Sequence, residues 1–136
     1  MKRLFASVLL SFMAFSCNIS DDSDYVHYDF VSISNVVMPE DFIVNELHEI
    51  TLTYNRPTNC HAFHNIYYNY ESDFERTVAI ICSVQGNNCE PLADSNYDAS
   101  FNFKPTTIGT YTFYFWQGED ANSENQYLTV EVQVTE

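Results

Sequence analysis

Basic residues are scarce in this chain, whose 136 residues include five Lys and Arg against nineteen Asp and Glu, a formal net charge of −14. Binding to nucleic acid depends on Lys and Arg that neutralise phosphates, so this composition excludes nucleic acid as a partner. Attraction to anionic lipid headgroups is excluded for the same reason. The many carboxylates are compatible with calcium but do not by themselves indicate a calcium site.

Patterns of common catalytic and cofactor sites are also missing. The chain contains no GxSxG, HExxH, Walker or Rossmann pattern. His61 and His64 follow Cys60, but residues three apart on a strand point to opposite faces, and no second pair stands at zinc-site spacing. We therefore expect no enzymatic activity, no metal and no cofactor.

Long apolar runs are limited to the N-terminus. The run Leu4–Phe15 is about a dozen residues long, whereas roughly 20 are needed to span a bilayer. It follows Lys2 and Arg3, and it ends at Ala14-Phe15-Ser16, where small residues occupy the two positions that signal peptidases inspect. Residues 1–16 are therefore predicted to be a cleaved export signal.

The residue after the predicted cleavage site is Cys17. A signal that ends at a small residue before cysteine resembles a bacterial lipoprotein signal, which implies that Cys17 carries lipid and attaches the protein to a membrane. Residues 18–24 form an acidic, serine-rich tether similar to that of surface-exposed Bacteroidota lipoproteins. The resemblance implies an exported protein, lipid-anchored in the outer membrane and exposed at the cell surface. An unlipidated Cys17 and a simple solvated linker are the alternatives.

Glycine is scarce, with three residues, while aromatic residues make up 16% of the chain. Together with many Val, Ile and Thr residues, this composition is typical of β-sheet. Apolar and polar residues alternate with a period of two, which predicts about seven strands. The expected strand segments are 25–33, 36–44, 49–55, 61–70, 74–84, 97–103, 110–117 and 127–134. We expect the first two segments to pair with each other, and residues 25–136 to form one all-β, antiparallel sandwich.

One motif refines this expectation. Gly109 and Tyr111 lie in a segment that resembles the tyrosine corner of immunoglobulin-like domains, where the Tyr hydrogen-bonds back to the preceding turn. Phe113 stands where antibody-type domains have a cysteine, so an apolar residue replaces the inter-sheet disulfide there. Further stretches resemble small Bacteroidota surface lipoproteins with one immunoglobulin-like sandwich: Asn59-Cys60, Tyr67-Tyr68, Arg76-Thr77-Val78-Ala79, Asn88-Cys89 and 109–116. This resemblance covers most of residues 40–134 and implies fold and location, but no activity.

If Cys17 carries lipid, three cysteines remain for one disulfide and one free thiol. A hairpin that turns near residues 71–73 places Cys60 at its open end, opposite the region that leads to Cys89. Cys82 shares its phase with apolar positions of the same strand, which predicts a buried thiol. We therefore predict a Cys60–Cys89 disulfide.

Two surfaces are candidate binding sites. The first is the end of the sandwich where we expect the loops 55–60, 85–96 and 118–126 to meet, with Arg56, Glu119, Asp120 and Asn122 as candidate binding residues. The acidic loop 118–126 is either a calcium ligand or simply solvated. The second surface is an outer sheet face, with Phe63, Tyr67, Tyr114 and Trp116 as candidate residues for sugar or protein. The alternative is that the N-terminal strand covers these four side chains.

The leading functional interpretation is a non-enzymatic, lipid-anchored surface module that binds protein or glycan. Residues 55–59 loosely resemble a loop of chagasin-type protease inhibitors, which are also immunoglobulin-like, so an inhibitor is one alternative. A purely structural domain of an envelope assembly is another. The sequence does not indicate the oligomeric state.

Overall fold

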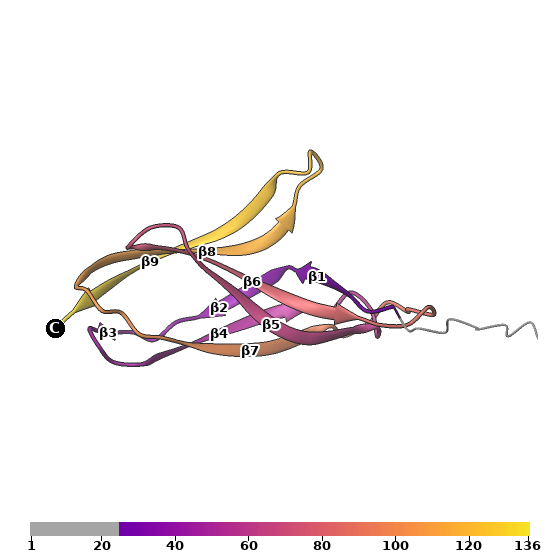
Figure 1. Ribbon diagram of the computed structural model, residues 1–136, viewed down its shortest axis with the longest axis horizontal. Coiled ribbons are helices and arrows are strands. Elements are labelled where there is room, and N and C mark those ends of the chain that lie inside the picture. The colour runs from indigo at the N-terminus through magenta and orange to yellow at the C-terminus, as the bar shows by residue number, and fades with distance from the viewer. Residues whose placement is uncertain (1–24) are drawn as a thin grey trace, which may run out of the picture.

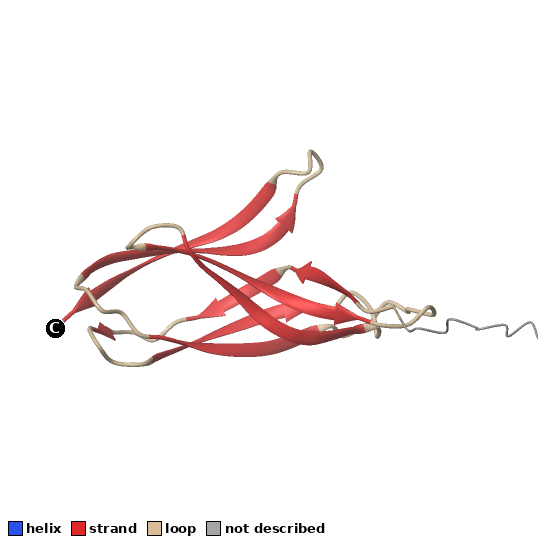
Figure 2. Cartoon of the chain, viewed as in Figure 1, coloured by secondary structure: helices blue, strands red, loops and turns tan. Residues whose placement is uncertain are grey.

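A computed structural model describes residues 25–136, and this part of the chain contains nine strands and no helix (Figure 2). Cys17, the export signal and the tether lie outside the described residues. The strands are β1 His27–Val31, β2 Ile33–Val37, β3 Phe42–Ile43, β4 His48–Asn55, β5 His61–Tyr70, β6 Glu75–Val84, β7 Asn96–Phe103, β8 Gly109–Glu119 and β9 Asn125–Thr135. They form two sheets, so the predicted β-sandwich is confirmed.

The larger sheet has six strands and the smaller has three, in the order β2-β4-β7 (Figure 1). In the larger sheet β5 and β6 form the predicted hairpin, and β8 and β9 form a second one. Most pairings are antiparallel, but β3 runs parallel to β9 and β6 runs parallel to β8. The described chain thus combines antiparallel hairpins with two short parallel contacts.

The first two predicted strands do not pair with each other, contrary to expectation. β1 pairs with β6 in the larger sheet, whereas β2 pairs with β4 in the smaller one. The chain crosses between the sheets at Ser32, and both neighbours of this residue, Val31 and Ile33, are buried. The two apolar side chains anchor the crossover, because burying each contributes about 1.5–3 kcal/mol.

The core follows from the alternation in the strands. Ile50, Leu52 and Tyr54 of β4 are buried, as their period-two spacing predicts. Phe113 and Phe115 of β8 face them from the larger sheet and are fully buried. The free thiol of Cys82 is also fully buried, as predicted. Phe113 occupies the place of the missing inter-sheet cysteine by packing edge-on against Phe103, with ring centroids 5.0 Å apart.

The predicted disulfide joins Cys60 to Cys89, with Cα atoms 5.3 Å apart. It fastens the start of β5 to the loop that follows β6. Nearby, Thr58 and Pro91 form an isolated bridge, and the Asn59 backbone N–H donates to the Glu90 carbonyl. The loops 55–60 and 85–96 therefore meet at one end of the sandwich.

The tyrosine corner differs from expectation. Within the described residues the Tyr111 hydroxyl makes no hydrogen bond to the preceding turn. Its ring is instead buried, edge-on to Phe74 at 5.0 Å and to Phe103 at 5.2 Å. Gly109 is required beside it, because its φ is +145° and a Cβ there would lie 3.0 Å from the Phe74 ring. The motif is thus used for aromatic packing.

One edge of β6 has two successive neighbours. Residues 75–78 pair with β8, whereas residues 80–84 pair with β1. Because β1 takes over this edge, β8 leaves the sheet after Phe115 and continues with β9 alone. Figure 1 shows the end of this hairpin projecting from the sandwich. We call residues 116–127 the arm.

Candidate binding groove

A groove lies between the arm and the outer face of the larger sheet, with a volume of about 410 Å³. Its lining comes from β1, β5, the turn between β5 and β6, β6 and both strands of the arm. The lining residues are Phe30, Tyr67, Glu71, Thr77, Ala79, Trp116, Glu119, Asn125 and Tyr127. The groove exists because β8 separates from β6 where β1 joins it.

The walls of the groove are aromatic. Phe30 stands in the middle, 5.7 Å from the Tyr67 ring and 5.9 Å from the Trp116 ring between centroids. Tyr127 lies opposite Trp116 in the arm. Phe30 is 54% exposed and Tyr127 is 42% exposed, so ring surface remains open to a ligand.

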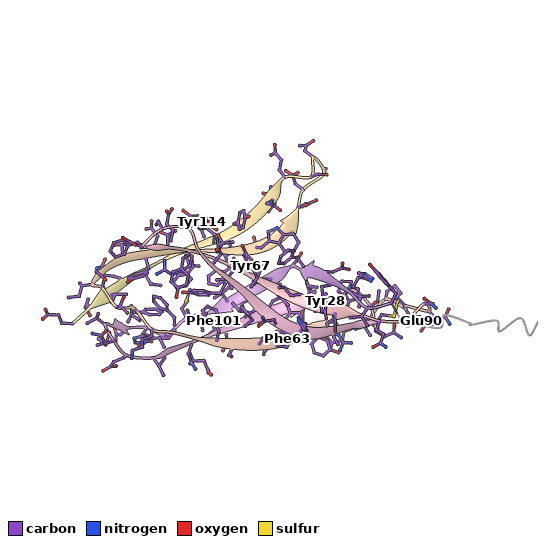
Figure 3. The ribbon with its side chains drawn as sticks, viewed as in Figure 1. Tyr28, Phe63, Tyr67, Glu90, Phe101 and Tyr114 are labelled. Carbon is purple, nitrogen blue, oxygen red and sulfur yellow. A yellow bond between two sulfur atoms is a disulfide. The ribbon has the colours of Figure 1, made fainter. Side chains whose placement is uncertain are left out.

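The candidate residues Tyr67 and Trp116 meet in this groove, but Phe63 does not join them. Residues four apart on a regular strand share a face. β5 has a bulge between Phe63 and Asn65, which shifts the register by one residue. Phe63 therefore turns to the inner side, where its ring lies 6.2 Å from that of Tyr54. Figure 3 shows Tyr67 towards the arm and Phe63 towards β7.

Tyr114 lies on the outer face beside the groove but is held by a neighbour. Its hydroxyl donates to Glu75 Oε1 at 2.9 Å, and this hydrogen bond raises the pKa of the phenol. The ring also lies edge-on to Tyr127 at 6.2 Å. Tyr114 thus supports the wall of the groove from behind.

The polar groups at the groove are carboxylates and amides. Asn69 donates a hydrogen bond to Glu71 Oε1 at 2.8 Å, and hydrogen bonds from Asn69 and Thr77 lower the pKa of Glu71. Glu119 contributes a second carboxylate from the arm. The lining contains no Lys or Arg. The groove therefore combines aromatic faces with carboxylate and amide hydrogen-bond acceptors.

The arm is held in place by contacts at its base. Trp116 Nε1 donates to Asn125 Oδ1 at 2.8 Å, and Gln117 Nε2 donates to the Ile33 carbonyl at 3.4 Å. Gly118 has a φ of +105°, and a Cβ there would lie 2.8 Å from Ser32 Oγ. The arm thus bends at a bulge that lies directly against the β1–β2 crossover.

Asp120 and Asn122 form the turn at the tip of the arm. Asp120 Oδ1 accepts from the backbone N–H groups of Asn122, at 2.8 Å, and of Glu124, at 3.0 Å. Asp120 Oδ2 accepts from Gln126 Nε2 at 3.3 Å. Through these hydrogen bonds the Asp120 carboxylate stabilises the turn. In residues 25–136, no group of three or more His, Cys, Asp or Glu side chains is arranged to hold a metal ion.

The three loops expected to meet at one end do not all do so. The loops 55–60 and 85–96 meet at the disulfide end, whereas 118–126 is the tip of the projecting arm (Figure 1). At the disulfide end Arg56 lies over the Tyr97 ring at 4.7 Å. The three loops therefore do not form one continuous surface.

The alternative that the N-terminal strand covers the outer aromatic residues is also resolved. β1 joins the sheet edge to edge with β6. Because Val31 faces the core, Tyr28 and Phe30 point outward and extend the aromatic face. Sequence reasoning missed Phe30, Tyr127, Glu71 and Asn125. The alternation of apolar and polar residues around Val31 indicated that Phe30 points outward. It did not indicate that β1 pairs with β6.

No family model, no curated protein and no solved structure matches the chain. None of the described residues belongs to a helix long and apolar enough to cross a membrane.

Proposed function

We propose that the protein is a non-enzymatic surface module, anchored through lipid on Cys17, that binds a neutral glycan in the groove beneath the arm. The observation that carries this proposal is the grouping of Phe30, Tyr67 and Trp116 around one open groove that two carboxylates also line.

The chemistry of the lining favours a sugar over other ligands. The C–H groups on one face of a pyranose ring are weakly positive, and they complement the negative face of an aromatic ring. Glu71, Glu119 and Asn125 supply oxygen atoms that accept hydrogen bonds from sugar hydroxyls. Because two carboxylates and no cation line the groove, a ligand with its own negative charge is disfavoured.

The first experiment is a glycan array with the chain from residue 17 onward and Cys17→Ser, which prevents lipidation. Hits are then measured by calorimetry with two matched variants. Tyr67→Ala removes a groove ring that is 38% exposed, while Tyr97→Ala removes a ring of the other sheet that is 37% exposed.

We expect Tyr67→Ala to weaken binding at least about tenfold, a loss of about 1.4 kcal/mol, because a stacking platform is lost. Tyr97→Ala should bind as the parent does. Trp116→Ala should abolish binding, since it removes a second ring and frees Asn125. Binding that survives both Tyr67→Ala and Trp116→Ala places the site elsewhere, and an array without hits contradicts the proposal for the glycan classes displayed.

A further inference from the structure

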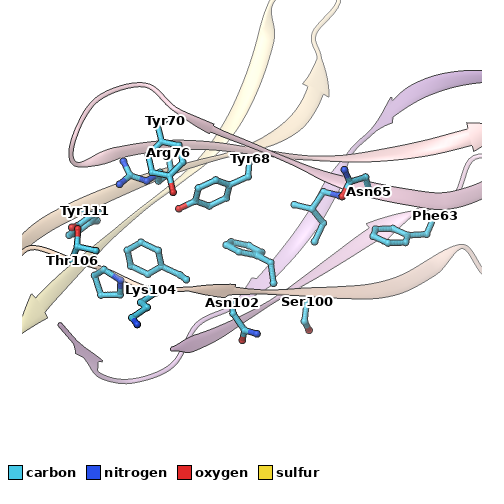
Figure 4. A pocket seen from close by; sticks show the side chains of 14 residues that line it. Phe63, Asn65, Tyr68, Tyr70, Arg76, Ser100, Asn102, Lys104, Thr106 and Tyr111 are labelled. Carbon is cyan, nitrogen blue, oxygen red and sulfur yellow. The ribbon is translucent and has the colours of Figure 1, made fainter. Parts of the chain in front are cut away.

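A second cavity, of about 580 Å³, opens between the two sheets on the side where β5 and β7 are the edge strands. These strands are not paired with each other, so the sandwich is open along this side. Figure 4 shows the side chains that line the cavity, with Phe63 at one end and Tyr70, Arg76, Lys104 and Tyr111 at the other. The volume is in the range typical of small-molecule sites.

Charge separates this cavity from the rest of the domain. Residues 25–136 contain sixteen of the nineteen acidic residues, because Asp21, Asp22 and Asp24 precede them, and only three basic residues. Two of the three basic residues, Arg76 and Lys104, line the cavity, and no Asp or Glu does. This is the reverse of the groove beneath the arm, whose lining has two carboxylates and no cation.

Arg76 is a buried cation without a carboxylate partner. It is 6% exposed, and no ion pair joins it to an Asp or Glu of the described chain. Its Nη1 donates to the carbonyls of Ser72, at 2.7 Å, and Glu75, at 2.8 Å, and its Nη2 donates to that of Asp73 at 3.0 Å. Its Nε is buried and has no hydrogen-bond partner. Carbonyl dipoles only partly compensate a buried charge, and no carboxylate of the cavity lining neutralises it.

Aromatic rings fix this cation at the end of the cavity. The guanidinium lies 4.2 Å from the centroid of the Tyr70 ring and 5.4 Å from that of Tyr111. Burial raises the pKa of the adjacent Tyr68, and Arg76 offsets part of this rise. The Tyr68 phenol is therefore neutral at physiological pH and available as a hydrogen-bond donor.

The other part of the cavity is apolar. Ile66 of β5 and Phe101 of β7 belong to the margin of the core and also line the cavity. Phe63 closes the far end, because the bulge in β5 turns it inward. The cavity thus has a cationic, phenol-bearing end and an apolar end that follows the two edge strands.

We propose that this cavity binds a linear amphipathic carboxylate, with its carboxylate at the Arg76 end, where the exposed Lys104 lies at the rim, and its alkyl chain between Ile66 and Phe101. The positive end complements the carboxylate, and the apolar walls complement the chain. This site is on the inner side of β5 and is separate from the groove. The proposal can therefore be tested independently of glycan binding.

Octanoate is the probe, and 1-octanol is its uncharged control with the same chain. Binding to the chain from residue 17 onward, with Cys17→Ser, is followed by amide chemical shifts in a titration. Lys104→Gln removes one cation of the site from an exposed position, so folding is preserved. Arg56→Gln is the matched control, because it removes the same charge at the disulfide end.

We expect saturable shifts in residues 66–70 and 100–106 with octanoate, and at least tenfold weaker binding of 1-octanol. Lys104→Gln should weaken octanoate binding several-fold, while Arg56→Gln should leave it unchanged. The proposal is overturned if millimolar octanoate gives no saturable shifts, if the shifts gather around Trp116, if the alcohol binds as tightly as the acid, or if Lys104→Gln has no effect.

Discussion

At the scale of single residues, the groove depends on positions that look ordinary in the sequence. The bulge before Asn65 decides that Tyr67 faces the groove while Phe63 faces the interior. A one-residue shift of register exchanges the two faces of a strand, so both the groove and the inter-sheet cavity depend on this bulge. Gly118 is the corresponding position in β8, since it combines a positive φ with close approach to Ser32.

Gly118→Ala should destabilise the protein by about 1–2 kcal/mol, because an L-residue is strained at a φ of +105°. The clash with Ser32 Oγ adds to this cost. Urea unfolding measures the change in the free energy of unfolding. Adding Ser32→Ala should recover only the part due to the clash. A double variant as stable as the parent contradicts the assignment of backbone strain.

At the scale of elements, the decisive feature is that one edge of β6 pairs with two different strands in succession. The first half of this strand has β8 as its neighbour and the second half has β1. Because β1 occupies the edge, the hairpin of β8 and β9 must leave the sheet as an arm. The groove is therefore a product of strand competition for one edge.

The disulfide is the second feature at this scale. It closes a segment with a sequence separation of 29 residues around the β5–β6 hairpin. Replacing both Cys60 and Cys89 by Ser should lower the free energy of unfolding by about 3–4 kcal/mol, because the unfolded chain gains entropy. Chemical denaturation of parent and variant measures this. Reduction of the parent should reproduce the loss, and a change below about 1 kcal/mol contradicts the entropic account.

At the scale of the whole molecule, charge is strongly segregated. The described chain carries few cations, and the inter-sheet cavity contains two of the three. The third, Arg56, lies at the disulfide end, and the groove is lined by two carboxylates and no cation. We propose that one small sandwich presents two sites with opposite ligand preferences, one for neutral hydroxyl-rich molecules and one for anions.

Stability should fall at alkaline pH. Burial raises the pKa of Tyr54 and of Tyr68 above the ordinary value of 10.0. The folded state therefore holds these protons more tightly than the unfolded chain. The stability from this difference is fully present below pH about 10 and is lost as the pH rises through the folded-state pKa. Urea midpoints across this range measure the loss.

Tyr68→Phe should flatten this alkaline decline, because one of the perturbed phenols is removed. For the parent and for Tyr68→Phe alike, the free energy of unfolding near neutral pH serves as the reference. An identical pH dependence in the parent and in Tyr68→Phe would show that Tyr68 does not contribute to the decline.

The sequence by itself determined the local features. Alternation along segments such as 49–55 predicted the buried face, because strand side chains have a period of two. The hairpin around residues 71–73 and the phase of Cys82 predicted the Cys60–Cys89 pairing, since a hairpin places its two ends together. Aromatic residues at alternate positions of β8 identified Trp116 as a surface candidate. Each of these inferences depends on residues that are near one another in the chain.

The tertiary structure alone decided which strands share an edge. The separation of β1 and β2 into different sheets, the parallel contact of β6 with β8 and the projection of the arm depend on competition between distant segments. The bulge at residues 63–65 interrupts the regular alternation of β5, and it places Phe63 and Tyr67 on different faces. Hydrophobic periodicity specifies which face of a strand is buried, but it does not specify which other strand pairs with it. For this reason both the groove and the inter-sheet cavity emerged only from the three-dimensional arrangement.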